Sequence, residues 1–239
     1  MARPPAIMLG VPSAGQWQAP MAVDAISAAV WASLHGIYVE PRGAESCYTE
    51  FNRNNIVRAA LNYENPIDAI MWFDADMRFP ADTIARLWSH GKDVVGSTYR
   101  ERIEPYRYLG KFVDKADEAA TEGLVPAELL PGGMILVKME LYRRLPPPWY
   151  KLDEDGLRDD YFFSKRARDA GYELWCDVPL TLKVRHRGEQ EVGWFEEGEA
   201  IARRDDDPRW RVFDNPALST PSETGYYGTG MSDQLGVRR

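Results

Sequence analysis

Two aspartates, Asp74 and Asp76, are separated by one residue and follow the apolar run "AIMWF". Residues two apart on an extended strand point to the same side. Their carboxylates would repel each other by roughly 1 kcal/mol in water, and by more where water is excluded. We therefore expect a counter-charge beside them. A divalent cation is one solution, because Mg²⁺ and Mn²⁺ prefer carboxylate oxygens as ligands.

The same spacing of two aspartates occurs twice more in the chain. Asp153–Asp155 and Asp205–Asp207 lie in polar surroundings and are most simply solvated loop charge. Only the pair at 74 and 76 follows an apolar strand. Because ligands bind outside the carboxyl ends of strands in open parallel sheets, this context favours a functional role for the pair.

A second acidic pair, Asp159 and Asp160, and one histidine, His186, are further candidates. The acidic pair begins an expected helix, where carboxylates are also favoured by capping and by the helix dipole, so a structural role stays open. A single histidine at a strand end is also more often structural than a ligand. His35 and His90 each precede a glycine at an expected helix end, which explains them, whereas His186 has no such explanation.

The elements that would position these residues alternate between strand and helix over the first hundred residues. Apolar runs predict strands at 6–12, 36–41, 68–74 and 92–99. Helical spacing predicts helices at 20–35, 52–63 and 80–91, the second with Ile56, Ala59, Ala60 and Tyr63 on one face. This alternation indicates an α/β fold, with a parallel sheet and helices on both of its faces.

The pattern changes after residue 100. It predicts an antiparallel strand at 106–114 and an apolar strand at 129–139 that is interrupted by two glycines. A helix at about 159–170 and a strand follow. The last predicted elements are a strand at 180–186 and a helix at 190–204. From residue 205 onward the composition shifts to Asp, Pro, Ser, Thr and Gly, which predicts an irregular tail at 205–239 beside a single domain at 1–204.

Composition narrows the class of protein. The chain has 239 residues, is 44% hydrophobic and carries a net charge of −8, which is typical of a globular protein without a broad basic face for nucleic acid. Cys47 and Cys176 are far apart and form neither a zinc motif nor a disulfide framework. With no recognisable signal peptide or membrane span, we expect a cytoplasmic location, in the host cytoplasm if a phage encodes the chain.

Taken in order, these pieces resemble a metal-dependent GT-A glycosyltransferase of the compact type found in bacteria and their phages. The matching stretches are "IMLGVPSAG", "NRNNIVRAAL", "AIMWFDADMRFPADTIARL", "KDVVGSTYRER", "LPGGMILVKMELYRRL", "DDYFFSKRARDAGYELWCD" and "VRHRG". The resemblance implies a GT-A (Rossmann-like) single domain with a mainly parallel central sheet and a smaller antiparallel part. Its nucleotide-binding half would span about 1–100 and its acceptor half about 101–204.

The resemblance also implies a metal and a donor substrate. The aspartate pair would hold Mn²⁺ or Mg²⁺ bridging the two phosphates of a nucleoside-diphosphate sugar, with a UDP-sugar favoured. Asp76 would be the direct ligand and His186 the other protein ligand. Asp74 would contact the ribose or a metal-bound water.

The remaining implied roles concern the nucleotide, the sugar and the base. Asp160 would be the catalytic base, although Asp159 stands where the family has a glutamate, and the reaction would invert the anomeric carbon. The residues expected to border the donor are Pro12, Ser13, Glu40, Arg53, Asn54, Gly132 and Gly133. The acceptor could be a glycan, a protein or a modified nucleobase.

Two other interpretations stay open. A phosphatase of the haloacid dehalogenase type also uses two aspartates after an apolar strand, the first as nucleophile and the second as general acid. In that group the pair lies on the first strand, whereas here two predicted strands precede it. The other alternative is a non-catalytic protein that binds sugar nucleotides.

Overall fold

The computed structural model describes residues 3–101, 108–114, 120, 122–152 and 158–187, and the backbone of 191–193. These residues belong to one compact unit, Met1–Arg203. The predicted tail at 205–239 lies outside the described residues. No helix in the described part is both long and apolar enough to cross a membrane.

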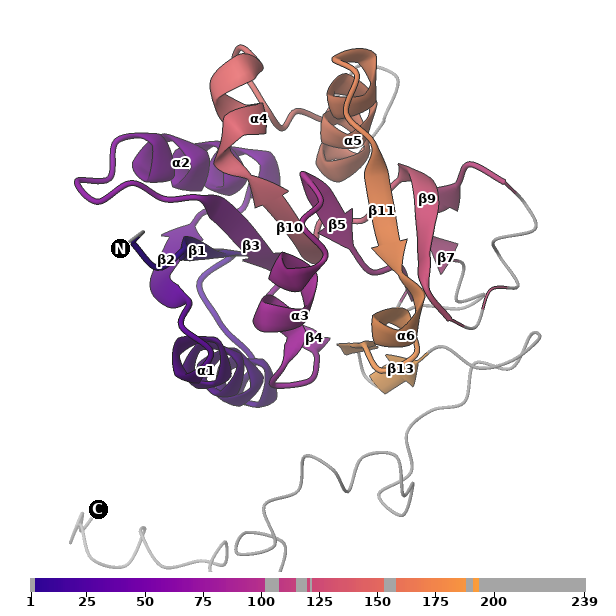
Figure 1. The fold of residues 1–239 in the computed structure, drawn as a ribbon, viewed down its shortest axis with the longest axis horizontal. Coiled ribbons are helices and arrows are strands. Elements are labelled where there is room, and N and C mark those ends of the chain that lie inside the picture. The colour runs from indigo at the N-terminus through magenta and orange to yellow at the C-terminus, as the bar shows by residue number, and fades with distance from the viewer. Residues whose placement is uncertain are drawn as a thin grey trace, which may run out of the picture. The chain divides into compact units, whose positions relative to one another are not determined.

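The centre of the molecule is an eight-stranded sheet in the order β2-β1-β3-β10-β5-β11-β9-β8 (Figure 1). Strands β1 (Ala6–Ser13), β2 (Tyr38–Glu45), β3 (Ala69–Phe73), β5 (Val94–Gly96) and β11 (Leu174–Asp177) run in one direction. Strands β10 (Met134–Lys138) and β9 (Leu124–Leu129) run against them, and β8 (Lys111–Phe112) pairs with β9. The predicted fold class, α/β with a mainly parallel sheet, is confirmed.

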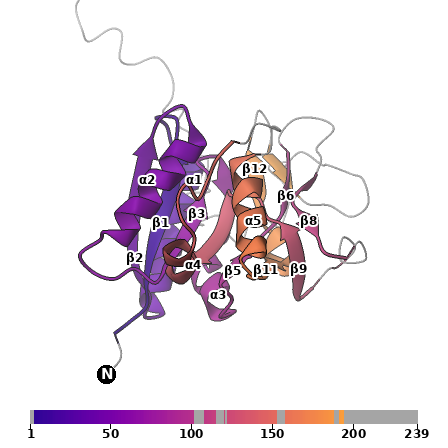
Figure 2. The ribbon, with the colours of Figure 1, turned by 90° about the horizontal axis from the view of Figure 1, so that it is seen from above.

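Helices cover both faces of this sheet (Figures 1 and 2). On one face, α1 (Ala19–Leu34), α3 (Thr83–Ser89) and α6 (Val178–Thr181) pack against the side chains of Leu9 and Met71. On the other, α2 (Thr49–Leu61), α4 (Met139–Arg144) and α5 (Asp159–Asp169) pack against Met8 and Trp72. The inner strands therefore bury both faces, which is why they read as continuous apolar runs.

Two small sheets lie beside the carboxyl end of β3. One is formed by β4 (Met77–Arg78), β12 (Arg185–Arg187) and β13 (Glu191–Gly193), and the other by β6 (Tyr99–Arg100) and β7 (Tyr108–Leu109). Both are antiparallel. They form the smaller antiparallel part that was expected.

Several predicted boundaries were wrong for identifiable reasons. The segment predicted as one strand at 106–114 divides into β7 and β8 at Gly110, whose φ is 115°. The strand predicted at 129–139 begins at Met134, because the chain turns at the two glycines after β9 ends. Part of the strand predicted at 180–186 belongs to α6, where the Asp177 carboxylate caps the helix by accepting from Leu180 N at 2.9 Å.

Two helix predictions also need correction. In the helix predicted at 190–204, the described residues 191–193 are strand β13, and the rest lies outside the described residues. In α2, Ile56 and Ala60 are buried as expected, but the buried face also carries Arg53 and Asn54. That polar part of the face leads to the site described next.

Candidate active site

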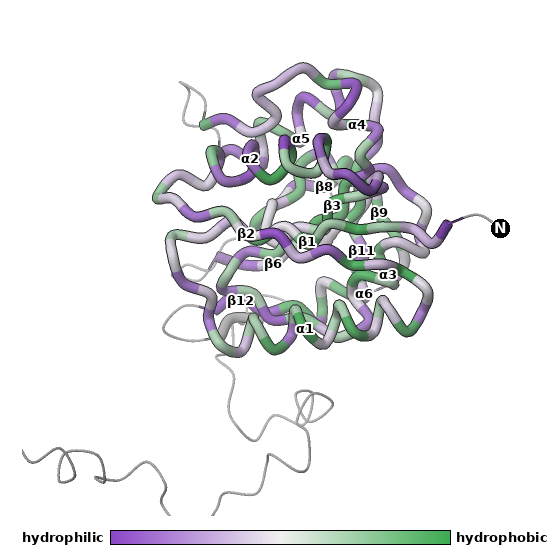
Figure 3. The backbone as a smooth tube through the Cα atoms, turned by 90° about the vertical axis from the view of Figure 1, so that its left-hand side faces the viewer, coloured by the Kyte–Doolittle hydropathy of each residue, from purple (hydrophilic) through white to green (hydrophobic). Residues whose placement is uncertain are grey.

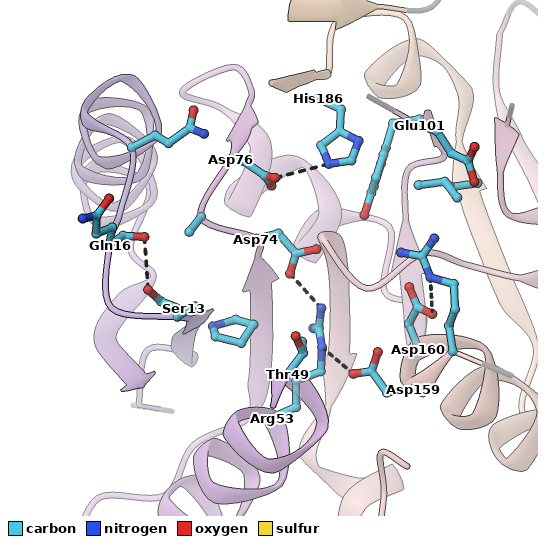
Figure 4. A pocket seen from close by; sticks show the side chains of 17 residues that line it. Ser13, Gln16, Thr49, Arg53, Asp74, Asp76, Glu101, Asp159, Asp160 and His186 are labelled. Carbon is cyan, nitrogen blue, oxygen red and sulfur yellow. Dashed lines mark hydrogen bonds and ion pairs between the residues drawn. The ribbon is translucent and has the colours of Figure 1, made fainter. Parts of the chain in front are cut away.

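An open cleft of about 800 Å³ lies at the carboxyl ends of β1 and β3 (Figure 4). This is where the strand-end rule places ligands in an open α/β sheet. Its walls come from the loop after β1, from α2, from the loop after β3, from β6, from the start of α5 and from β12. Besides Tyr99, the charged or titratable side chains that line it are Arg53, Asp74, Asp76, Glu101, Arg158, Asp159, Asp160 and His186.

The two aspartates after β3 do not share one partner. The strand ends at Phe73, and Met77 N donates to Asp74 O at 3.2 Å, so the pair lies on a turn rather than on an extended strand. Asp74 consequently faces Arg53, whereas Asp76 faces His186 (Figure 4). The expected extended backbone was wrong, but both carboxylates line the same cleft.

Arg53 connects the two acidic pairs. Its guanidinium lies 2.7 Å from Asp74 Oδ1 and 3.1 Å from Asp159 Oδ2, and it donates to the Gly132 carbonyl at 2.9 Å. The side chain is only 2% exposed and lies over the Trp72 ring, 5.3 Å from its centroid. Burial alone would lower the pKa of Arg53, but the two carboxylates outweigh it and raise that pKa. A buried charge of this kind depends on its partners.

His186 and Asp76 are brought together by strand pairing. Strand β12 pairs with β4, and Arg187 N donates to Asp76 O at 2.8 Å, which sets the two side chains beside each other. His186 Nδ1 lies 2.9 Å from the carbonyl oxygen of Arg100. Because a carbonyl only accepts, Nδ1 carries the proton. In the neutral ring, Nε2 then carries a lone pair, and this nitrogen lies 3.5 Å from Asp76 Oδ2.

Asp76 and His186 offer the kinds of donor atom that bind a metal ion. Two electron-pair donors face each other, and the second ring nitrogen of the histidine is held by a backbone carbonyl, as is usual for metal-bound imidazole. The described residues contain no cluster of three or more metal-binding side chains. Two protein ligands suffice for Mg²⁺ when substrate phosphates and water complete its coordination.

Asp160 is a buried carboxylate at the first turn of α5. It is 5% exposed, and its oxygens accept from Gly132 N and Tyr161 N, each at 2.9 Å. Burial raises the pKa of Asp160, and neighbouring Asp159 raises it further, while Arg158 and the Gly132 amide oppose the shift. A raised pKa is the property expected of a carboxylate that accepts a proton in catalysis.

The glycine pair at 132 and 133 lies directly behind these side chains. A Cβ on Gly132 would meet Arg53 Nη2 at 2.7 Å, and one on Gly133 would meet the Tyr99 hydroxyl at 2.3 Å and Asp74 Oδ2 at 2.7 Å. The absence of side chains at these positions is thus required by the site's own residues. Their expected contact with donor sugar and acceptor stays a prediction.

Besides the two glycines, Glu40 and Asn54 are sequence-predicted residues that do not line the cleft. Glu40 lies in the middle of β2, where its carboxylate accepts from Tyr38 at 2.7 Å, because β2 continues to Glu45 instead of stopping at Pro41. Asn54 is buried on the far side of α2, where its amide donates to Tyr150 O at 2.7 Å. Neither residue lines the cleft, and their expected contact with the nucleotide stays a prediction.

Pro12 and Ser13 do line the cleft, as expected, and so do residues that sequence reasoning missed. Tyr99 belongs to no recognised sequence motif. It does end the run "VVGSTY", however, and the strand-end rule that selected Asp74 applies to it equally. Arg158 directly precedes the acidic pair, and its Nε lies 3.8 Å from Asp160 Oδ1. An arginine directly before two aspartates is visible in the sequence, and it could have identified Arg158 as a candidate.

Comparisons with known proteins bear on the fold. No protein-family model and no curated protein matches the chain. Among solved structures, A197 from STIV is similar over 83% of this chain and 94% of that chain, with a TM-score of 0.56 and 16% identity. A glycosyltransferase involved in the glycosylation of the major capsid of PBCV-1 matches over 61% of this chain and 70% of that chain, with a TM-score of 0.35 and 14% identity.

The first of these likenesses concerns architecture alone, because the identity is so low. It agrees with the GT-A-like fold expected from the sequence. The second is too distant to carry an argument. What the cleft does chemically must therefore be argued from its residues.

Proposed function

We propose that this chain is a metal-dependent glycosyltransferase, which moves a sugar from a nucleoside-diphosphate sugar to an acceptor hydroxyl. One observation carries the proposal: His186 Nε2 lies 3.5 Å from Asp76 Oδ2, in a cleft that also holds the acidic pair at the start of α5. A cation site and a buried carboxylate within one cleft are the two parts that such a transfer needs.

The charge of the cleft supports a metal. Five carboxylates and two guanidinium groups line it, so with all of them ionised the cleft is negative and repels a diphosphate. Asp76 and His186 would hold Mn²⁺ or Mg²⁺. When bound, the metal offsets the negative charge that develops on the diphosphate leaving group, an effect of several kcal/mol.

The chain's own residues have distinct tasks in this proposal. Pro12 and Ser13 border the base and ribose from the end of β1. Arg53 holds Asp74 in place, so that its second carboxylate oxygen can accept from a ribose hydroxyl or a metal-bound water. A UDP-sugar is the favoured donor, on the resemblance of the sequence.

Asp160 is the proposed base. Its carboxylate accepts two backbone N–H groups and keeps further lone pairs for the acceptor hydroxyl. It takes the hydroxyl proton as the acceptor oxygen bonds to the anomeric carbon and the bond from that carbon to the diphosphate oxygen breaks. Attack from the face opposite the diphosphate inverts the anomeric carbon. Asp159 stays paired with Arg53 and maintains its position.

The phosphatase alternative gains no support from these contacts. Its nucleophile would be Asp74, whose Oδ1 is 2.7 Å from Arg53 in a partly buried ion pair. It also assigns no task to His186. The non-catalytic alternative predicts binding of sugar nucleotides without turnover, and the experiment below separates it from an enzyme.

The experiment measures the melting temperature and sugar-nucleotide turnover with Mn²⁺ and a panel of nucleoside-diphosphate sugars. A ligand at 100 times its dissociation constant stabilises the folded state by about 2.7 kcal/mol. Asp76→Asn should abolish both the shift and turnover, whereas Asp93→Asn, at a surface aspartate paired with Lys138, should change neither. If no nucleotide stabilises the wild-type chain in Mn²⁺, the proposal fails; binding without turnover of any donor supports the non-catalytic alternative.

A further inference from the structure

The outer face of α1 is apolar along most of its length. Val23, Ile26, Val30, Trp31 and Leu34 are between 42% and 78% exposed there. Because residues three and four apart are neighbours on a helix, these five side chains form one continuous strip, here called the α1 stripe. Figure 3 shows α1 along the lower edge of the molecule, with hydrophobic colours recurring along it.

This arrangement reverses the usual one for a surface helix. Such a helix ordinarily buries one apolar face and presents charged residues to water. The opposite face of α1 is indeed buried in the core beneath the sheet. Its outer face, however, carries five of the large hydrophobic side chains exposed in the described residues. Contiguous apolar surface of this kind marks an interaction site.

Polar groups on the same helix already have partners within it. The hydroxyls of Ser27 and Ser33 donate to the carbonyls four residues earlier, at 2.8 and 2.9 Å. His35 Nδ1 lies 2.8 Å from the Trp31 carbonyl oxygen. Burying a hydroxyl costs little when its hydrogen bond is retained. The face can therefore be covered without leaving these donors unpaired.

The absence of charge narrows the class of partner. The only charged residue of α1 is Asp24, which is buried and lies 2.6 Å from Arg78 Nε. Helices that lie on membranes typically carry lysines or arginines beside their apolar face, and α1 has none. The chain's net charge of −8 also opposes binding to anionic lipid. These features favour an apolar protein surface as the partner.

We propose that the α1 stripe is the interface of a symmetric dimer of this chain. A two-fold axis brings the same patch of both copies together, so a second copy supplies an uncharged face of matching chemistry. The stripe presents on the order of 500 Å² per copy, and the pair buries about 1,000 Å², which is the lower limit for a specific interface. Interfaces of this small area are typical of weak, transient complexes, so we expect association in the micromolar range.

Val30 is the position that tests this geometry best. It lies close to the midpoint of the stripe, so a two-fold axis through the stripe places the two Val30 side chains near each other. The stripe shares no residue with the cleft. Substitutions in it should therefore leave the cleft intact, and the dimer can be tested independently of the proposed transferase.

Sedimentation velocity on the full chain between about 1 and 300 µM provides the test. The wild type should shift from monomer to dimer over this range. Val30→Lys should raise the dissociation constant at least tenfold, as should Val30→Glu. An equimolar mixture of these two variants should dimerise again. Val113→Lys, a matched change at a side chain that is 60% exposed elsewhere, should dimerise like the wild type.

Circular dichroism melting distinguishes loss of the interface from loss of the fold, because Val30 is 55% exposed and its replacement should change the melting temperature little. The proposal is overturned if the wild type remains monomeric at every concentration, or if Val30→Lys dimerises as tightly as the wild type. Flotation of a monomeric wild type with phosphatidylcholine vesicles would also overturn it and would make the stripe a membrane-binding face.

Discussion

The guanidinium of Arg53 lies between Asp74 and Asp159, 2.7 Å from one carboxylate and 3.1 Å from the other. These aspartates come from different parts of the chain, one following β3 and the other beginning α5. Arg53 thereby ties the two acidic pairs of the cleft to α2. Five predictions follow from this network and from the residues around it.

Replacing Arg53 by methionine should destabilise the protein strongly. The change leaves Asp74 and Asp159, which are 30% and 16% exposed, without their cation. Breaking a fully buried ion pair typically costs about 3–5 kcal/mol, so we expect a loss toward the lower end of that range. Urea unfolding measures the effect. Arg143→Met is the matched control, because Arg143 lies 3.9 Å from Glu140 at the surface, where a pair contributes about 0–1 kcal/mol. Equal effects of the two changes would contradict a central role for Arg53.

Replacing His186 by alanine should weaken Mn²⁺ binding. Loss of one of two protein ligands should lower the affinity at least tenfold, since even a partner of a metal ligand typically contributes 10–100-fold. Isothermal titration calorimetry with Mn²⁺ and a nucleoside diphosphate measures it. His35→Ala is the control, because that ring bonds the Trp31 carbonyl on α1. Unchanged Mn²⁺ affinity in His186→Ala would remove this residue from the metal site.

Replacing Asp160 by asparagine should slow turnover about 10²–10⁴-fold, which is the usual contribution of a positioned base. Binding of the donor should remain, because the proposed metal ligands are Asp76 and His186. Stopped-time assays of sugar transfer, together with calorimetry of donor binding, separate the two effects. Transfer at the wild-type rate in Asp160→Asn would mean that another group accepts the proton.

The pH dependence should follow the raised pKa of Asp160. A base works only when ionised, so turnover should fall as pH drops through a pKa that lies above the ordinary aspartate value of about 3.9. The same shift acts on stability with a definite sign. Because the folded state binds this proton more readily than the unfolded chain does, ionised Asp160 destabilises the fold, and that cost disappears as pH falls through the raised pKa. Asp160→Asn should remove this contribution.

Alanine at position 133 should be poorly tolerated. Its Cβ would lie 2.3 Å from the Tyr99 hydroxyl and 2.7 Å from Asp74 Oδ2, and such overpacking typically costs about 1–3 kcal/mol. Thermal unfolding measures the loss, and adding Tyr99→Phe should recover part of it. Gly43→Ala is the control, since its Cβ would meet only Trp17 at 3.6 Å. Equal stability of Gly133→Ala and Gly43→Ala would contradict the crowded packing.

Local pattern predicted most of the elements in residues 1–100 well. The apolar runs that became β1 and β3 are buried throughout, and helices begin near the positions that proline and spacing indicated. Prediction failed where one segment serves two elements. The chain around Gly110, the turn before β10 and the short helix α6 all interrupt runs whose composition looks uniform. Such breaks are set by pairing with distant strands.

The candidate site shows the same division. Asp74, Asp76, Asp159, Asp160 and His186 were identified from residue type and strand-end position, and the cleft contains all of them. Glu40 and Asn54 do not line it, because the end of β2 and the orientation of α2 depend on neighbours that no local pattern records. Tyr99 was missed although it ends the predicted strand at 92–99, because its role depends on Gly133, 34 positions away.

The sequence by itself determined which segments are buried strands and which residues are candidates for the site, since burial and capping act over a few residues. Only the tertiary structure decided how those residues combine. The pairing of β4 with β12 places His186 beside Asp76, and the turn after β3 separates Asp76 from Asp74. The tertiary structure also leaves the α1 stripe exposed to solvent. The helical period alone does not tell which apolar face of α1 the sheet will cover.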